Sequence, residues 1–553
     1  MRQVSSDDII IIMSKKVETS KELIEKKLEV SRMSRSELEK QVMLLTTTLE
    51  ESMMKLSWYE EQLRRATEEK FGPSSEKSVD AAQISFFNEA EAESTLAGVE
   101  PTLEEIQEEK EDRKKKPVGK KEKMTRDLPT VVLNYTLSEG EQDCPQCGEH
   151  LHEMKTIVRK ELTVVPATVH VTERVQHVYT CRTCEGKEIK TPVVYAPMPA
   201  PVLTNSIASP SLVAQIMTKK YVEAVPLYRQ EQQLQRYGFD ISRQTMSNWV
   251  VRTSELWLKR LYGRMKEELL RQEVLHADET VLEVIREPGR EATSTSYMWV
   301  YRTGNVGKDI VLYEYTPRRS GENAEKFLKG FLGFLHTDGY AGYHRLLGPV
   351  TLVGCWSHMR RKFSDALQGI APNGIMSRSL ATEGFNHCNG LFRLEKKWAK
   401  LTPEERLEKR KKEAEPLVSA YFAWIRELEP SILPKSLLGK AFTYAKNQEA
   451  NLRNYLKDGR LEISNNRAER SVKPFVIGRK NWLFANTPAG ATSSAIIYSI
   501  VETAKENGLN PFPYLEYLLE SIPNLDQNGL TMEDMLPWSE SLPDKCRSKN
   551  IKK

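Results

Sequence analysis

Three acidic residues, far apart in the sequence, lie in local settings that suit metal-dependent phosphodiester chemistry. Asp278 interrupts a long apolar run, which predicts a buried strand that carries a charge. Asp338 ends a second apolar run and precedes a glycine, which lets a ligand approach the backbone closely. Glu469 lies in an Asn-Asn-Arg-Ala-Glu-Arg sequence that predicts the start of a helix. Two carboxylates on strands and one on a later helix can hold two Mg²⁺ or Mn²⁺ ions, and such sites cleave and join phosphodiesters.

The elements expected around these carboxylates follow the order of an RNase H-like core. Strands are predicted at 274–284, 296–302, 310–315 and 334–337, a helix at 323–331, and a strand followed by a helix at 350–367. We therefore expect a multidomain α/β protein with an RNase H-like catalytic domain at 273–510. Residues 370–456 combine dense charge at helical spacing with an apolar face, which predicts a helical insertion between the second and third carboxylates.

Other residues compete for roles at this site. Glu279 follows Asp278 directly, and because neighbours on a strand face opposite sides, one of the two is expected to point into the site. Glu283 and Glu462 are weaker competitors. Cys355 and His358 could form a nucleophilic or metal-binding pair, but no second histidine has a comparable setting, so the sequence favours a core cysteine beside a hydrogen-bonded histidine.

Basic and amide residues near the acidic positions are candidates for DNA contacts. Arg360, Arg361 and Lys362 are consecutive, so a helix spreads them around its axis and one or two are expected to reach a phosphate. Asn466 and Arg470 flank the third carboxylate and, with Asn465 and Arg467, supply donors for a DNA backbone.

Two Cys-x-x-Cys pairs predict a structural zinc ribbon at 128–200. Its four thiolate ligands are Cys144, Cys147, Cys181 and Cys184. Small apolar residues alternate between the pairs, which is typical of short strands. A histidine at 150 or 152 could replace one ligand, and a redox role for either pair is the alternative. A closed site of four thiolates has no open coordination position, so we assign it a structural or DNA-docking role.

The residues before the ribbon divide into two parts. At 1–76 we expect a helical region, because apolar residues follow a heptad pattern at 38–66 that favours a coiled coil and therefore a homo-oligomer. An amphipathic helix packed on its own protein is the alternative. At 77–127 the chain is charged and poor in aromatic residues, which predicts a disordered linker. The basic run at 113–126 serves as linker alone or also contacts DNA.

A helical DNA-binding domain is predicted at 201–272. Ser242 is expected to cap a helix that follows a glycine-containing turn, in the manner of a helix-turn-helix. In that interpretation Arg243, Gln244 and Asn248 face a DNA groove. An ordinary helical hairpin is the alternative. Residues 511–553 are expected to form a C-terminal tail.

Length and composition limit the possible classes of protein. A chain of 553 residues is too long to fold around a single hydrophobic core, so several domains are expected. The longest apolar run near the N-terminus, at 9–13, is far shorter than the ~20 residues of a membrane span. We therefore expect no membrane association and a cytoplasmic location.

The ordered motifs resemble one family, the large transposase of bacterial insertion-sequence family 66. The motifs are Phe-Gly-Pro-Ser-Ser-Glu-Lys at 71–77, the cysteine pairs, His-Ala-Asp-Glu-Thr at 276–280, Thr-Asp-Gly-Tyr at 337–340, Gly-Cys-Trp-Ser-His-Met-Arg-Arg-Lys-Phe at 354–363, Asn-Asn-Arg-Ala-Glu-Arg at 465–470, Gly-Arg-Lys-Asn-Trp at 478–482 and Leu-Pro-Trp at 536–538. Pro73 departs from the pattern, because a basic residue is expected there. This weakens the prediction of a DNA contact at that position and leaves the prediction of the catalytic residues unchanged.

The resemblance implies a DDE-type enzyme that cleaves and transfers DNA strands with Mg²⁺. Its acidic triad is again Asp278, Asp338 and Glu469. Its expected partners are the terminal inverted repeats of its element, target DNA, and small accessory proteins of the same element, and its expected place is the bacterial nucleoid. Two other readings stay open. One is a catalytically inactive DNA-binding regulator, which would bind DNA without cleaving it. The other is a related RNase H-like DNA nuclease, which would cleave without strand transfer.

Overall fold

The computed structural model describes residues 34–35, 146, 169–180, 193–346, 348, 350–368 and 379–548. The predicted heptad at 38–66 and the linker at 77–127 lie outside the described residues. So do the four predicted zinc ligands, Cys144, Cys147, Cys181 and Cys184. The chain clusters into two units, and the smaller includes Lys362–Phe385 and Ala423–Lys446. The five-stranded sheet and the carboxylates belong to the larger unit.

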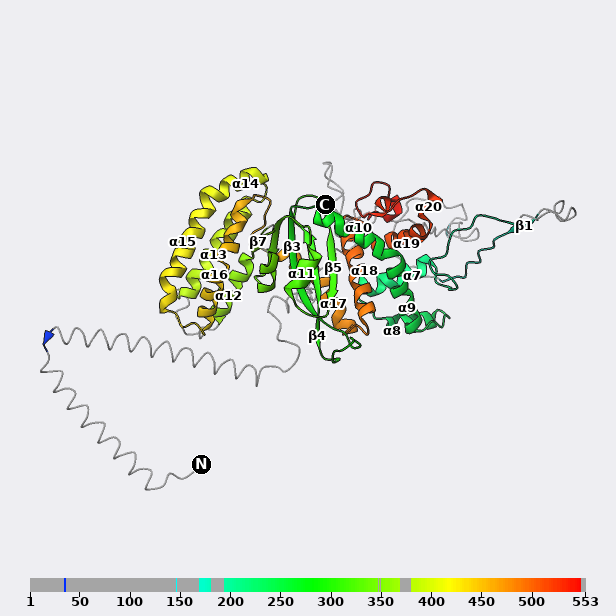
Figure 1. Cartoon of the computed structure of the whole chain (residues 1–553), viewed down its shortest axis with the longest axis horizontal. Coiled ribbons are helices and arrows are strands. Elements are labelled where there is room, and N and C mark those ends of the chain that lie inside the picture. The colour runs from blue at the N-terminus through cyan, green and yellow to red at the C-terminus, as the bar shows by residue number, and fades with distance from the viewer. Residues whose placement is uncertain are drawn as a thin grey trace, which may run out of the picture. The chain divides into compact units, whose positions relative to one another are not determined.

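A mixed five-stranded sheet forms the centre of the larger unit (Figure 1). Its strands are β3 (Val274–Glu283), β4 (Thr295–Thr303), β5 (Val311–Thr316), β6 (Gly333–Thr337) and β7 (Val350–Gly354). Their order is β5-β4-β3-β6-β7. β4 runs antiparallel to both neighbours, whereas β3, β6 and β7 are parallel. The strands predicted at 274–284, 296–302, 310–315 and 334–337 are confirmed, each boundary within one residue.

The register of β3 and β6 brings two acidic positions to the same end of the sheet. His276 pairs with His336 in the parallel ladder, and their rings stack with centroids 4.3 Å apart. Asp278 and Asp338 each follow two residues later along parallel chains. The two carboxylates therefore emerge at neighbouring points of the sheet.

Helix α18 (Pro488–Glu506) covers the edge strand β5. The Ser499 hydroxyl accepts a hydrogen bond of 2.7 Å from the Tyr313 backbone N–H. The Thr503 hydroxyl accepts one of 3.0 Å from Val311 N–H and donates one of 2.9 Å to its carbonyl oxygen. Because an exposed edge offers unpaired backbone groups to other chains, these hydroxyls protect the edge of the sheet.

The helix predicted at 323–331 is present, but it begins two residues earlier and ends four residues earlier than expected. Helix α11 covers Gly321–Phe327, and the Ser320 hydroxyl caps it by accepting a hydrogen bond from Glu322 N–H. Gly330 has a positive φ of 89°, so the segment that was expected to end the helix is a turn.

Helices predicted before the sheet are present. They are α7 (Pro210–Tyr221), α8 (Leu227–Arg236), α9 (Arg243–Thr253) and α10 (Lys259–Leu270), with a π-helical turn at Ser254–Leu258. The Ser242 hydroxyl accepts from Thr245 N–H at 3.2 Å, which confirms the predicted cap of α9. Gly238, with φ of 86°, makes the turn between α8 and α9. The C-terminal segment carries α19 (Pro511–Ser521), which packs against α7, and α20 (Leu525–Asn528).

Helices follow β7 and occupy the described part of the insertion predicted at 370–456. They are α12 (Trp356–Gln368), α13 (Leu380–Lys397), α14 (Pro403–Lys409), α15 (Glu415–Leu428) and α16 (Leu437–Arg453). Within the larger unit, the fully buried Arg410 ties α13 to the chain that leads into α17 (Asn466–Trp482). Its guanidinium donates to the Glu395 carboxylate at 2.8 Å and to three backbone carbonyls, those of Tyr455, Asp458 and Leu461. A buried charge with all its donors satisfied fixes this geometry firmly.

Candidate metal and nucleic-acid site

Three elements of the larger unit carry the three predicted carboxylates. Asp278 lies within β3, Asp338 follows β6 directly, and Glu469 lies in the first turn of α17. α17 packs against β3. All three side chains are partly exposed, and those of Asp338 and Glu469 have 24% and 27% of their area accessible. The structure thus brings residues separated by up to 191 positions close enough for the charges of Asp338 and Glu469 to raise the pKa of Asp278.

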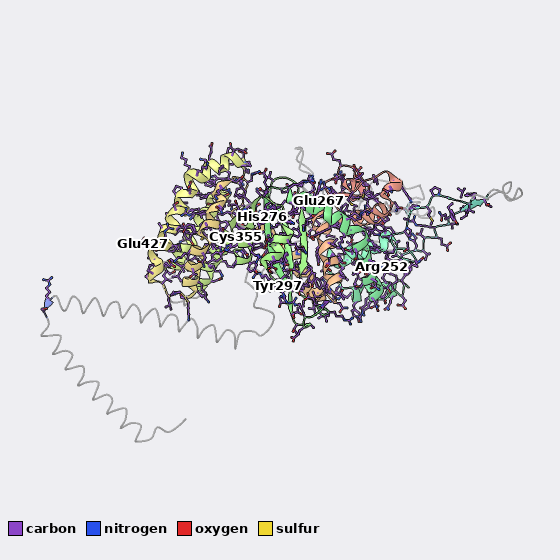
Figure 2. The ribbon with its side chains drawn as sticks, in the orientation of Figure 1. Arg252, Glu267, His276, Tyr297, Cys355 and Glu427 are labelled. Atoms are coloured by element: carbon purple, nitrogen blue, oxygen red, sulfur yellow. The ribbon has the colours of Figure 1, made fainter. Side chains whose placement is uncertain are left out.

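Asn465 joins the start of α17 to the strand that carries Asp278. Its side-chain N–H donates to the Ala277 carbonyl oxygen at 2.8 Å, and its Oδ1 lies 3.0 Å from His276 Nδ1. Since that oxygen can only accept, His276 donates from Nδ1. The backbone N–H of Asn465 donates to Cys355 Sγ at 3.2 Å. Both His276 and Cys355 are labelled in Figure 2.

Asn465 is completely buried, so it does not contact DNA, contrary to the expectation for this residue. It instead joins the start of α17 to β3, and we call it the clip. Burial lowers the pKa of His276 to about 3, and the imidazole therefore stays neutral and keeps its single Nδ1 proton for this bond. The clip sets the distance between β3 and the first turn of α17.

The electrostatics of the site centre on Asp278. Burial raises its pKa well above the usual value, and the neighbouring charges of Glu279, Asp338 and Glu469 raise it further. Its Oδ1 accepts one hydrogen bond, from Glu279 N–H at 2.9 Å. Carboxylates that lie close together repel one another, and this repulsion raises their pKa values. Such arrangements are concentrated at functional sites.

Glu279, the competitor at the first acidic position, is engaged elsewhere. Its carboxylate accepts a hydrogen bond of 2.8 Å from the Tyr343 hydroxyl and pairs with the Arg319 guanidinium at 2.7 Å. Arg319 also lies 3.7 Å from Asp338 Oδ2 and stacks over the Tyr340 ring. Burial and the charge of Asp338 raise the pKa of Glu279 as well, whereas Asp278 responds to both Asp338 and Glu469.

Helix α12 brings a histidine and an arginine to the third carboxylate. His358 Nδ1 lies 3.7 Å from Glu469 Oε1, and Arg361 lies 3.6 Å from Oε2. The i, i+3 spacing of His358 and Arg361 places both on one face of the helix, and this was the signal available in the sequence. The sequence favours His358 as a hydrogen-bonded neighbour of the core cysteine, and its place beside Glu469 is found only in the structure.

Cys355 is a buried residue at the start of α12. Its Sγ, a ring nitrogen of His358 and a carboxylate oxygen of Glu469 lie within 4.8 Å of one another. Burial raises the pKa of the Cys355 thiol to about 11, so the thiol remains protonated at neutral pH. Because the thiolate is the form that binds metals and attacks substrates, this cysteine fits a structural role.

The other predicted DNA-contacting residues lie on two surfaces and one pocket wall. Arg243, Gln244 and Asn248 are exposed near the start of α9. Arg470 is exposed and Asn466 half-buried on the first turn of α17. Arg360 lines a pocket, and Lys362, in the smaller unit, places its ammonium 5.9 Å from the Tyr444 ring centroid.

The donor set suits a hard divalent cation. Asp278, Asp338 and Glu469 offer carboxylate oxygens, which Mg²⁺ and Mn²⁺ prefer. Glu469 Oε1 is buried and has no hydrogen-bond partner among the described residues. A cation at this place would relieve the repulsion that raises the pKa of Asp278. The three side chains therefore fit such an ion in their chemical type, whereas the described residues whose ligand atoms lie within 4.8 Å of one another are Cys355, His358 and Glu469.

No helix in the described part of the chain has both the length and the apolar character needed to cross a bilayer.

Family models match most of the chain. One described as the IS66 family of transposases matches residues 205–493, and one described as the zinc-finger binding domain of transposase IS66 matches 141–185. An IS66 C-terminal element matches 499–538, and a model described as transposase C of IS166 homeodomain matches 58–132. The first match includes all three carboxylates, and the second includes all four predicted zinc ligands.

Similar proteins occur in Sinorhizobium fredii (strain NBRC 101917 / NGR234). The uncharacterized protein y4jD is 29% identical over 428 residues, which cover 74% of this chain and 81% of y4jD. The uncharacterized protein y4qI is 30% identical over 398 residues, which cover 69% of this chain and 70% of y4qI.

Proposed function

The chain belongs to the IS66 family of transposases, and from this membership we propose that it binds the terminal inverted repeats of its insertion sequence and cleaves and transfers DNA strands with the help of divalent metal ions. The observation that carries the proposal is the convergence of Asp278, Asp338 and Glu469. The charges of Asp338 and Glu469 both raise the pKa of Asp278, although the three residues lie on separate elements of the chain. A site of clustered carboxylates open to solvent matches the needs of phosphodiester chemistry.

The sheet supports an RNase H-like catalytic domain. Its order, β5-β4-β3-β6-β7, combines three antiparallel strands with two parallel additions, and the acidic residues follow the central strand, its parallel neighbour and a later helix. We propose the catalytic domain at 273–510 with its helical insertion at about 370–456. The regions proposed before it are the helical N-terminus at 1–76, the linker at 77–127, the zinc ribbon at 128–200 and the helical domain at 201–272.

Each carboxylate has a distinct proposed role. Asp278 would help to hold both metal ions, and Asp338 and Glu469 would each help to hold one of them. When bound, the ions would lower the pKa of an attacking hydroxyl or water and would stabilise the charge on the leaving oxygen. Arg319 and Arg361 lie within 4 Å of the flanking carboxylates, so they are placed to neutralise phosphate oxygens once the carboxylates bind metal.

DNA binding is assigned to several parts of the chain. We propose that the zinc ribbon of Cys144, Cys147, Cys181 and Cys184 docks on DNA and that α9 presents Arg243, Gln244 and Asn248 to a groove. Nearer the carboxylates, the proposed DNA-contacting residues are Arg360, Arg361, Lys362, Asn466 and Arg470. The protein is proposed to act as a homo-oligomer on nucleoid DNA, with small accessory proteins of its element as possible partners.

A strand-transfer assay with Asp338→Ala tests this proposal. The full chain is incubated with Mg²⁺, a labelled duplex that carries the element's terminal repeats, and a supercoiled target. The wild-type protein is expected to nick the 3′ ends and join them to the target. Asp338→Ala is expected to lose both steps while it binds the duplex nearly as well, because metal binding is lost and the DNA-binding modules remain.

Asp544→Ala is the matched control, since that carboxylate is fully exposed near the C-terminus. Cleavage retained by Asp338→Ala would refute the assignment of the site. Binding without cleavage by the wild-type protein would favour a DNA-binding regulator, and cleavage without joining would favour a nuclease of the same fold.

A further inference from the structure

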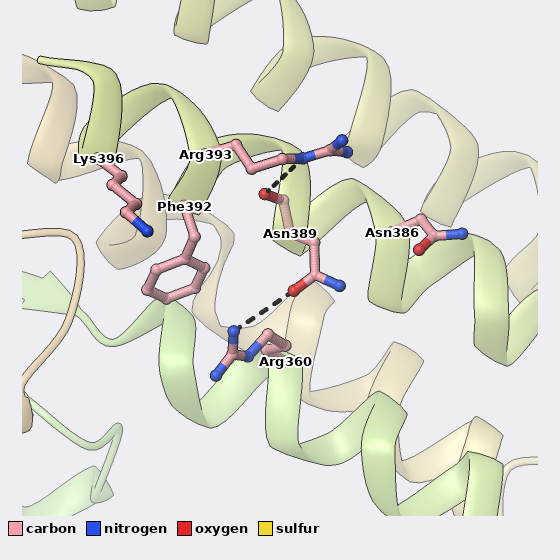
Figure 3. Close-up of a pocket in the computed structure, with 6 residues that line it drawn as sticks. All are labelled: Arg360, Asn386, Asn389, Phe392, Arg393 and Lys396. Atoms are coloured by element: carbon pink, nitrogen blue, oxygen red, sulfur yellow. Dashed lines mark hydrogen bonds between the residues drawn. The ribbon is translucent and has the colours of Figure 1, made fainter.

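A basic pocket lies between α12 and α13 in the larger unit (Figure 3). Its volume is about 410 Å³. Its lining residues are Arg360 from α12 and Asn386, Asn389, Phe392, Arg393 and Lys396 from α13. None of the lining residues that the structure describes is acidic.

The spacing of the lining residues explains the pocket. Asn386, Asn389, Arg393 and Lys396 recur at intervals of three and four, so they form one face of α13. Glu395 lies on a different face, where it pairs with Arg410 at 2.8 Å. The nearest acidic side chain of the helix is therefore engaged elsewhere, and the pocket keeps a local positive charge.

Contacts within the pocket hold the guanidinium of Arg360 against the aromatic ring of Phe392. The Arg360 guanidinium lies over the Phe392 ring, 4.8 Å from its centroid, and donates a hydrogen bond of 3.4 Å to Asn389 Oδ1. Figure 3 shows Phe392 between Arg360 and Lys396, with the Lys396 amine turned toward the ring. A planar cation held on an aromatic ring, with an amide beside it, is a surface that nucleobases stack on.

The three cations, the ring and the amides together match one class of ligand. Arg360, Arg393 and Lys396 supply charge for phosphates, Phe392 supplies an aromatic face, and Asn386 and Asn389 supply groups that can bond base edges. A base can reach such a ring only after it has left the duplex stack. The volume lies in the range of sites that enclose a small ligand, about 300–1,000 Å³, which admits a nucleotide and excludes a duplex.

The same helix connects the pocket to the carboxylates. His358 and Arg361 on α12 reach Glu469, while Arg360, next in sequence to Arg361, reaches the pocket. The pocket and the carboxylates therefore lie on neighbouring faces of the same helix, about 100° apart around its axis. We propose that the pocket binds an unpaired nucleotide of a DNA strand at the active site, with its base stacked on Phe392 and its phosphates bound by Arg360, Arg393 and Lys396. This inference rests on the proposed function and names a subsite of it.

The test uses the fluorescence of 2-aminopurine, which is quenched when the base stacks. The full chain, without divalent metal, is mixed with a duplex that ends in a short single-stranded overhang carrying the probe. Separate substrates place the overhang on either strand of a terminal-repeat end or on DNA of unrelated sequence. These arms show whether the bound nucleotide comes from one strand of the element end or from any DNA.

Wild-type protein is expected to quench the probe, and Phe392→Leu is expected to abolish quenching and weaken overhang binding roughly 5- to 100-fold, the contribution of one stacked base. Binding of a blunt duplex should change by less than about twofold. Phe392→Trp should retain quenching. Arg393→Glu should weaken overhang binding more than Lys400→Glu, an equal charge change at an exposed residue outside the pocket.

Quenching that persists in Phe392→Leu, or an equal loss of overhang and blunt-duplex binding, would overturn the proposal. Asp338→Ala should leave quenching unchanged, because the carboxylates are not needed for stacking. Phe392-dependent quenching in a protein that fails to cleave would support the pocket and count against the proposed catalysis alone. Normal cleavage with no quenching in any arm would refute the pocket alone.

Discussion

Asp278 and Glu279 are adjacent acidic residues on β3 with different surroundings. Glu279 has an arginine and a tyrosine hydroxyl as partners, whereas Asp278 faces carboxylates. A residue with its own counter-charge is stable as it stands, and one surrounded by like charges is stable only when a proton or a cation joins it. The two adjacent acidic residues therefore differ in electrostatic surroundings because of their tertiary contacts and not because of their residue type.

A half-buried carboxylate away from the site gives a test of the same physics. Glu314 on β5 is half-buried, and burial raises its pKa to about 7, although Lys266 and Lys326 oppose the rise. Its Oε2 is buried with no hydrogen-bond partner among the described residues. The folded state therefore holds this proton at pH values where the unfolded state has released it.

We predict that Glu314→Gln stabilises the protein at pH 8 and has little effect at pH 5. At pH 8 the Glu314 carboxylate is ionised in the folded protein, which lowers the free energy of unfolding by about 1–3 kcal/mol. The amide of the variant carries no charge and avoids this loss. Below the unfolded pKa, both states carry the proton and the cost disappears, so stability falls as pH rises from about 4.5 toward 7. Urea unfolding at both pH values measures the difference. The control is Glu408→Gln at an exposed position, and an equal effect of Glu314→Gln at both pH values would contradict the prediction.

At the scale of elements, the position of Glu469 relative to Asp278 depends on how α17 is attached to β3. Asn465 makes this attachment through the His276 ring, the Ala277 carbonyl and the Cys355 sulfur. The Arg410 network supports it by fixing the chain from Tyr455 to Leu461, just before α17 begins. Both attachments use buried polar groups, which are costly to leave unpaired and so define one arrangement.

Asn465→Ala is expected to destabilise the fold by about 2–4 kcal/mol, because it leaves a buried imidazole and a buried carbonyl without partners. The variant that remains folded should also lose metal-dependent cleavage more than it loses DNA affinity, since Glu469 is no longer held opposite Asp278. Chemical unfolding and the cleavage assay measure the two effects.

Asn481→Ala makes the same change at an exposed position of the same helix and should cost less than about 0.5 kcal/mol. Wild-type stability and wild-type cleavage in Asn465→Ala would show that the clip does not position the carboxylate.

At the scale of the whole molecule, the chain combines a catalytic unit with segments that family models match on its N-terminal side. The model for the zinc-finger binding domain spans both cysteine pairs, which agrees with the predicted ribbon. Metal binding and folding are coupled in such small domains, because the site exists only in the folded state.

Cys144→Ser is expected to reduce the zinc content of the purified protein and to weaken binding to terminal-repeat DNA, because the ribbon at 128–200 loses a ligand. Metal analysis and a DNA-binding titration measure the two effects. Cys388→Ala is the control, since this buried thiol lies on α13, outside the ribbon. Zinc content equal to that of the wild-type protein would exclude Cys144 as a ligand.

The sequence alone predicted the strands, the cap of α9 and the three carboxylates. These features depend on side chains within a few positions of each other, where periodicity and capping preferences act directly. The family resemblance followed from the same local motifs, and the family models agree with it.

The tertiary structure decided which of these residues meet. The sequence could not order the strands, pair Glu279 with Arg319, place His358 at Glu469, or recognise Asn465 as a buried clip. It also gave no sign that Arg360 and the polar face of α13 enclose one pocket. Each of these depends on contacts between residues tens to hundreds of positions apart. Such contacts are set by the packing of the whole core, and no local preference encodes them.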